Sequence, residues 1–156
     1  MAGSGGGGHL QSQASSLLTE ALYSLGLAAI MRGDVAYALR LSDESIRLAK
    51  EEGMTLDYNV LGVALCLSAL GELELTTRLH GAADGLIEHI GQSFVNLSGR
   101  LRERDHSHLR QTMGEKPFEE AYSAGRCLTS SEAVALAELS IQRLLDRPRA
   151  VSPNVR

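Results

Sequence analysis

The sequence predicts an all-α protein, and three observations lead to this fold class. Apolar residues recur every three or four positions over most of the chain, which is the period of a helix face, and no stretch alternates with the period of two typical of a strand. Glycines separate these apolar stretches at intervals. Only three of the 156 residues are proline, and one of them lies between residues 9 and 147, so long helices meet little obstruction.

The first two predicted helices are separated by Gly33. The first has an apolar face that we expect to be buried. This face is formed by Ala14, Leu17, Leu18, Ala21, Leu22, Leu25, Ala28 and Ala29. Asp34 follows the glycine and has the short carboxylate favoured at a helix N-cap. A second helix is therefore expected to begin there and to end at Gly53.

The third and fourth predicted helices follow in the same pattern. Thr55 is a candidate N-cap for the third, and residues 60–70 are apolar on nearly every side, so this helix is expected to be buried all round. Gly71 ends it. The fourth helix has a regular apolar stripe over residues 75–90 and is expected to end at Gly91.

Three further helices complete the prediction, which makes about seven. The fifth is more polar and covers residues 97–113. Gly114 and Pro117 separate it from a short sixth piece that contains Phe118. The seventh begins with Thr-Ser-Ser-Glu at residues 129–132, the pattern of a capping box.

The chain divides into a single helical domain and two flanking segments. Residues 1–9 contain five glycines and are expected to form a flexible leader outside the fold. The helical domain covers residues 10–146. Residues 147–156 lack periodicity and are expected to form a disordered tail.

The first four predicted helices form two copies of one unit. The shift that places Gly33 on Gly71 also places Gly53 on Gly91, together with many apolar positions between them. Two helices per unit and a period in the thirties are typical of helical solenoids. The pattern resembles the tetratricopeptide repeat (TPR), which implies a short right-handed solenoid capped by the C-terminal helices. The alternative is an irregular bundle with a coincidental repeat.

Composition excludes several classes of function. The net charge of −4 argues against a domain that neutralises nucleic-acid phosphates. Two cysteines are too few for a disulfide framework. The longest apolar run, residues 60–70, is shorter than the roughly 20 residues that cross a bilayer, and no basic segment precedes an apolar one at the start of the chain. We therefore expect a cytoplasmic protein that binds neither membrane nor nucleic acid directly.

A distinctive string of short motifs lies between residues 79 and 136. It contains LHGAAD at residues 79–84, MGE at 113–115, FEEAY at 118–122, GRCLT at 125–129 and EAV at 132–134. This string resembles the C-terminal helical-repeat region of large bacterial ATP-binding transcriptional regulators of the LuxR-type and AAA/NACHT-like classes. The resemblance implies a sensing and interaction arm that contacts a protein partner or adjoining regulator domains.

The chain itself contains no Walker A motif, so the ATP-binding and DNA-binding parts of such a regulator are expected elsewhere. We expect no enzymatic activity and no cofactor, because no Ser/His/Asp set has motif spacing. Two alternatives stay open. One is a homo-oligomeric helical scaffold, in the simplest case a homodimer, and the other is a helical domain that binds a small molecule.

A partner-binding groove is expected on the concave side that the first helix of each TPR-like pair would form. Its candidate residues are Glu20, Tyr23, Leu27, Tyr58, Leu61 and Leu65. Two of the six aromatic side chains of the chain fall in this set, and tyrosine is favoured at binding surfaces. The seventh helix or a second copy of the chain could instead cover the groove.

The remaining candidate residues are charged or metal-binding in type. His106 and His108 point about 200° apart on a helix, so they cannot share a metal and are expected to lie on a solvated surface. No metal site is predicted. A basic surface is predicted on the fifth helix, where it could meet an acidic partner or a phosphate, although an ordinary charged helix face is the simpler interpretation. Its residues are Arg100, Arg102, Arg104 and Arg110.

Overall fold

A computed structural model describes residues 5–146 and confirms the all-α fold class. Within these residues the chain forms seven helices and no strand. They are α1 (Gly5–Met31), α2 (Val35–Glu51), α3 (Asp57–Ala69), α4 (Leu73–His89), α5 (Asn96–Met113), α6 (Glu115–Arg126) and α7 (Ser130–Leu145). The predicted tail, residues 147–156, lies outside the described part of the chain, as do residues 1–4.

The predicted repeat is present in the helix boundaries. The shift that places Gly33 on Gly71 also places both ends of α2 on those of α4, and the end of α1 on the end of α3. Gly33 and Gly71 sit at equivalent turns with φ of 81° and 76°, a region that side chains with a Cβ rarely adopt. The correspondence fails only at the start of α1, because α1 has 27 residues and its counterpart α3 has 13.

Two of the three predicted caps are confirmed. The Asp34 carboxylate accepts a hydrogen bond from the Tyr37 amide at 3.2 Å. Thr129 and Glu132 form both hydrogen bonds of the capping box. The prediction for Thr55 is wrong, because α3 begins two residues later and Leu56, which has no capping side chain, holds the N-cap position. Pro117 lies in the first turn of α6, where its missing N–H costs nothing.

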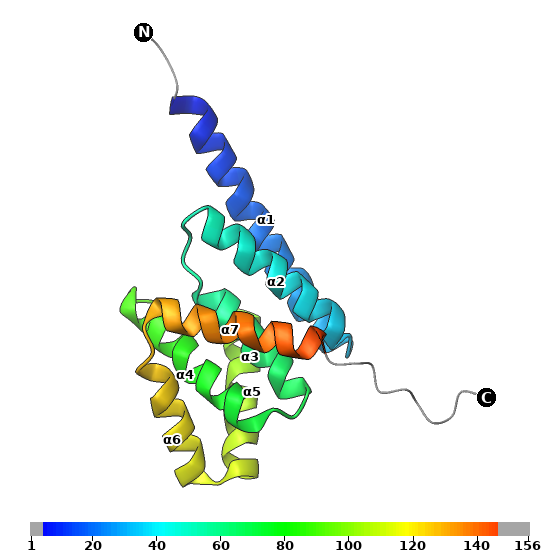
Figure 1. Cartoon of the computed structure of the whole chain (residues 1–156), viewed down its shortest axis with the longest axis vertical. Helices are drawn as coiled ribbons and strands as arrows, with labels where there is room; N and C mark the ends of the chain where they lie inside the picture. The colour runs from blue at the N-terminus through cyan, green and yellow to red at the C-terminus, as the bar shows by residue number, and fades with distance from the viewer. Residues whose placement is uncertain (1–4, 147–156) are drawn as a thin grey trace, which may run out of the picture.

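The core surrounds α3, as the apolar sequence of this helix predicts. Every residue from Asn59 to Leu67 is buried. α4 pairs with α3, α1 with α2, and α7 lies across α2, α3 and α4 (Figure 1). An ion pair of 3.0 Å between Lys50 and Glu138 also joins α2 to α7.

The C-terminal helices do not continue the succession of neighbouring hairpins. The principal partner of α4 outside its own hairpin is α6, not α5. Two glycines allow this contact: a Cβ at Gly81 would overlap the carbonyl group of Tyr122, and one at Gly125 would overlap that of Arg78. The two backbones therefore approach as closely as helices can.

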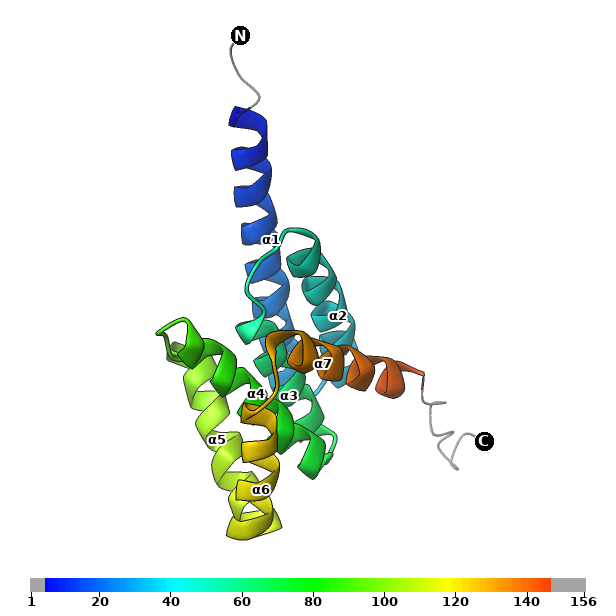
Figure 2. The ribbon, with the colours of Figure 1, turned by 60° about the vertical axis from the view of Figure 1, so that its left-hand side comes forward.

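The first half of α1 projects beyond the rest of the molecule (Figures 1 and 2). This half includes residues 5–9. Their glycine content predicts that they belong to a flexible leader, whereas in the structure they are helical. The expected burial of its apolar face is wrong in large part: Leu22 and Ala29 are buried, whereas Leu17 and Leu25 are 68% and 48% exposed. The reason is that α2 covers one side of α1 and only along its second half. By length and composition alone, residues 6–31 could also cross a membrane.

Candidate functional site

The main candidate binding site is a groove of about 920 Å³ beside the second half of α1. One wall is formed by α1, the other by the 53–55 turn with the start of α3 and by residues 95–98 at the start of α5. Its apolar lining consists mainly of Tyr23, Leu27, Met31, Met54, Tyr58, Val95 and Leu97. Met31 and Val95 are exposed, so the groove reaches the protein surface.

Three aromatic rings from different elements stiffen the groove. The rings of Tyr23 and Tyr58 meet edge to face at 5.5 Å, and Tyr58 meets Phe94 in the same way at 4.9 Å. The hydroxyls of Tyr23 and Ser98 are hydrogen-bonded at 2.7 Å, which connects α1 to α5. Burial raises the pKa of Tyr23 to about 12, so its hydroxyl stays protonated well above neutral pH.

The charge in the groove has one sign. Glu20 and Asp57 are the only charged residues in its lining, and both are carboxylates. Glu20 is exposed at the α1 wall, whereas Asp57 is 5% exposed at the start of α3. A ligand that enters the groove therefore meets apolar side chains and a negative potential.

Four of the six predicted groove residues line this groove: Glu20, Tyr23, Leu27 and Tyr58. The prediction is wrong for Leu61 and Leu65, which are 0% and 2% exposed and belong to the core, because α3 is surrounded by other helices beyond its first turn. The seventh helix contributes no residue to the lining, so α7 does not cover the groove.

Apart from Tyr58, nothing in the sequence points directly to the second wall. Met54, Val95 and Leu97 lie in a turn and around the start of α5, far from α1 in the chain. A hydrophobic residue in a turn, such as exposed Val95, is the only local signal that these positions have a role beyond the core.

The predicted basic surface is wrong as a single surface. Arg102 is half-buried and forms two hydrogen bonds with Asp84, and Arg110 is paired with Glu115 and Glu119 on α6. Arg100 and Arg104 are exposed to solvent, and 40% of the side chain of the paired Arg110 is exposed as well. Two of the four positive charges therefore stabilise contacts between helices and are not available to an acidic partner.

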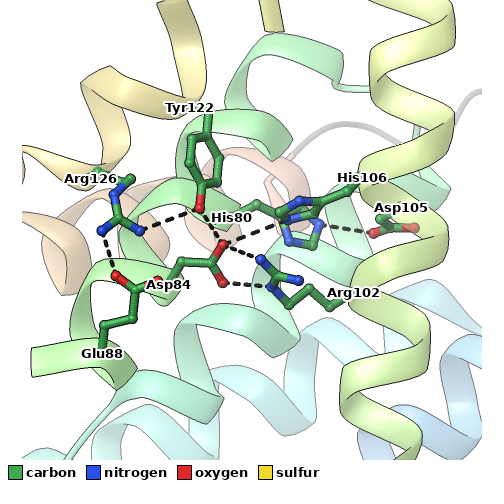
Figure 3. A network of polar contacts seen from close by, with 8 residues as sticks. All are labelled: His80, Asp84, Glu88, Arg102, Asp105, His106, Tyr122 and Arg126. Carbon is green, nitrogen blue, oxygen red and sulfur yellow. Dashed lines mark hydrogen bonds and ion pairs between the residues drawn. The ribbon is translucent and has the colours of Figure 1, made fainter. Parts of the chain in front are cut away.

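Asp84 is the centre of a polar network between α4, α5 and α6 (Figure 3). It accepts hydrogen bonds from Arg102 Nε at 2.7 Å and Nη2 at 2.6 Å, and from the Tyr122 hydroxyl at 2.5 Å. Burial opposes ionisation of Asp84, but the hydrogen bonds from Arg102 and Tyr122 outweigh it and lower the pKa of the carboxyl below its usual value. At the edge of the network, Arg126 bridges Glu88 and Tyr122.

Two histidines extend this network into the core. His80 is fully buried, and its Nε2 lies 3.1 Å from Asp105 Oδ2. The His106 ring meets the His80 ring edge to face at 4.8 Å. Burial, with help from His80 and Arg102, lowers the pKa of His106 to about 3. The prediction of His106 as a solvated residue is therefore wrong: 13% of its side chain is exposed, and it packs between α4 and α6.

The polar network holds α4, α5 and α6 together. Its residues His80 and Asp84 are buried. In the described part of the chain, no group of three or more His, Cys, Asp or Glu side chains could hold a metal ion. Cys66 lies in the core, where burial raises the pKa of its thiol to about 12, and Cys127 is exposed. The groove is thus the stronger candidate for a functional site.

Comparison of the chain with protein-family models, with curated proteins and with solved structures finds no match.

Proposed function

We propose that this chain is a non-enzymatic protein-interaction domain that binds a segment of a partner protein in the groove. The observation that carries the proposal is the groove itself: an apolar surface with an edge-to-face aromatic wall and two carboxylates as its only charges. Such a lining suits a segment with apolar side chains and one or two Lys or Arg residues.

The architecture that we propose is a short right-handed TPR-like solenoid of two hairpins, capped by α5, α6 and α7. The repeated boundaries of α1–α2 and α3–α4 support it. So does the position of the groove, which lies along α1 and the start of α3, the first helices of the two hairpins. TPR-like domains bind partners on this side, formed by the first helix of each pair.

The biological setting that we propose follows the resemblance of residues 79–136. In that setting the chain is the cytoplasmic sensing arm of a bacterial transcriptional regulator. Because the groove lies between α1 and α5, an occupant that binds both walls favours one arrangement of α1 relative to α5. Domains attached to the arm would respond to this change in population.

Selection from a phage-displayed random peptide library tests the proposal. We expect enriched peptides to combine apolar residues with Lys or Arg, and we expect Glu20→Lys to weaken their binding about 10-fold or more. Glu103→Lys is the matched control, since Glu103 is exposed on α5 outside the groove and gives the same change of charge. Failure to enrich peptides, or equal binding by both variants, would contradict the proposal.

A small organic ligand is the second candidate, because the groove volume falls in the range of about 300–1,000 Å³ common for small-molecule sites. A thermal-shift screen of apolar cations separates this function from peptide binding. Small-molecule binding would be favoured by a ligand that raises the melting temperature of the wild type and not that of Val95→Asp. The peptides selected from the phage library should in that case fail to bind.

A further inference from the structure

A stripe of apolar side chains runs along the exposed side of α1. Its seven positions are separated alternately by four and three residues, the spacing of the a and d positions of a coiled coil. They are Leu10, Ala14, Leu17, Ala21, Ser24, Ala28 and Met31. All seven are exposed, and six of them are apolar. Leu18 and Leu25 lie beside the stripe and are also exposed, which widens it on one side.

No described part of the chain covers this stripe. Leu10, Leu17 and Met31 are each more than 60% exposed. The core takes a different face of α1, which carries Leu22 and Ala29. The upper part of the stripe also lies on the N-terminal extension of α1 that has no counterpart in α3, so the hairpin repeat does not require it.

We propose that the stripe binds the α1 helix of a second copy of this chain in an antiparallel pair. Alanines occupy every a position (Ala14, Ala21 and Ala28), and larger side chains occupy three of the four d positions. An antiparallel pair places each a position opposite a d position, so each leucine packs against an alanine of the other helix. A parallel pair would place alanine against alanine and leucine against leucine, which leaves gaps in alternate layers.

The size and charge of the stripe both suit a second copy. Residues 7–31 span about 36 Å, and half the helix circumference along that length is roughly 600 Å² for each copy. The total of about 1,200 Å² reaches the range of specific interfaces. Glu20 is the only Asp, Glu, Lys or Arg residue in α1, so two copies of the stripe meet with little charge repulsion.

A lipid bilayer is the competing occupant, and the packing of α1 disfavours it. Leu22, Leu27 and Ala29 are buried against the rest of the domain, so the second half of α1 would have to leave the core in order to enter a membrane. The remaining helix, residues 5–21, measures about 25 Å, which is less than the bilayer core of about 30 Å. It also contains Glu20, two glutamines and three serines.

The pairing surface can be tested separately from the groove. Leu10, Ala14, Leu17 and Ala21 belong to the stripe and not to the groove lining. The other three stripe positions, Ser24, Ala28 and Met31, also line the groove, so a second copy and a partner segment would compete for this part of α1. Substitutions at the first four positions affect self-association without altering the groove walls.

Light scattering and sedimentation over about 1 to 200 μM protein test the proposal. We expect the wild type to dimerise and Leu17→Glu to raise the dimer dissociation constant about 100-fold or more. Leu139→Glu is the matched control, because Leu139 is 57% exposed on α7 outside the stripe. Circular dichroism of each variant checks that the fold is kept. A monomeric wild type, or equal weakening by both variants, would overturn the proposal.

Cross-linking tests the direction of the pair in a Cys127→Ser background. Leu10→Cys mixed with Ala28→Cys should cross-link through a short bismaleimide, because full overlap of residues 7–31 places these two positions opposite each other, whereas Leu10→Cys alone should not. Cross-linking of Leu10→Cys with itself would overturn the antiparallel arrangement. A second outcome would overturn the proposal in favour of lipid. The wild type would be monomeric and would bind vesicles of phosphatidylcholine and phosphatidylglycerol, and Leu17→Glu would lose this binding.

Discussion

Individual polar side chains contribute to the pH response of this protein, and His106 is one whose pKa lies far from its ordinary value. Its pKa is about 3 in the folded chain, compared with the ordinary value of 6.5. The groups that face it are His80 and Asp84 on α4, Phe118 and Tyr122 on α6, and Arg102 and Arg110 on its own helix. Between pH 6.5 and 3 the unfolded chain takes up a proton at His106 that the folded chain does not, so acid favours unfolding.

The free energy of unfolding should therefore decrease as the pH is lowered below 6.5, and His106 should contribute up to about 1.4 kcal/mol per pH unit to this decrease. Urea unfolding at several pH values measures the free energy of unfolding. His106→Gln should reduce the slope between about pH 6.5 and 4, and His108→Gln, at an exposed position two residues away, should leave it unchanged. Equal slopes for His106→Gln and the wild type would show that the histidine is not buried in its neutral form.

The Asp84 carboxylate has a separate role, which is to hold Arg102 and Tyr122 against α4. Asp84→Asn removes the charge and leaves the half-buried guanidinium of Arg102 without its partner. We expect a loss of about 2–4 kcal/mol in unfolding free energy. This is less than the cost of breaking a fully buried ion pair, because 26% of the Arg102 side chain is exposed.

Asp43→Asn is the control for Asp84→Asn, since Asp43 also pairs with an arginine, Arg47, but on the exposed surface of α2. This change should cost less than about 1 kcal/mol. If the two substitutions cost the same, the network between α4, α5 and α6 is not a stabilising centre.

Among the helices, the closest approach is between α4 and α6 at Gly81 and Gly125. Gly81→Ala would force the backbone of α6 to move, because the atoms it meets belong to the main chain of Tyr122 and Arg126. We expect a destabilisation of about 3 kcal/mol, measured by thermal or urea unfolding.

Gly26→Ala provides the contrast, because Gly26 also lies inside a helix but a Cβ there meets no atom within 4 Å. Alanine should stabilise α1 by about 0.5–1 kcal/mol at this position. A stabilising Gly81→Ala substitution would contradict the close α4–α6 packing.

The helices that could be predicted from the sequence are those whose ends are encoded locally. Asp34, Thr129 and the glycine turns act on the few residues next to them, so the sequence predicts their structure directly. Longer-range relations could not be predicted in this way. His106 meets His80 and Tyr122, which belong to two other helices, and nothing near it in the sequence indicates burial.

At the scale of the whole molecule, the apolar periodicity of α1 predicts which of its faces is hydrophobic and not what covers that face. Part of it, including Leu22, packs on the domain, and part, including Leu17, is left to a second copy in our proposal. The groove shows the same limit. Tyr23 and Tyr58 could be predicted as neighbours from the repeat, but the wall around Val95 depends on where the chain returns after α4.

Methionine methyl groups offer a direct measurement of groove binding. Met31 and Met54 lie on opposite walls of the groove. Met113 lies away from it at the end of α5, where its sulfur contacts the Thr77 hydroxyl, and it serves as an internal reference. We predict that titration of ¹³C-methyl-labelled protein with a library-selected peptide shifts the Met31 and Met54 signals and leaves that of Met113 in place. A peptide that binds and leaves Met31 and Met54 unchanged would contradict the assignment of the groove as the partner-binding site.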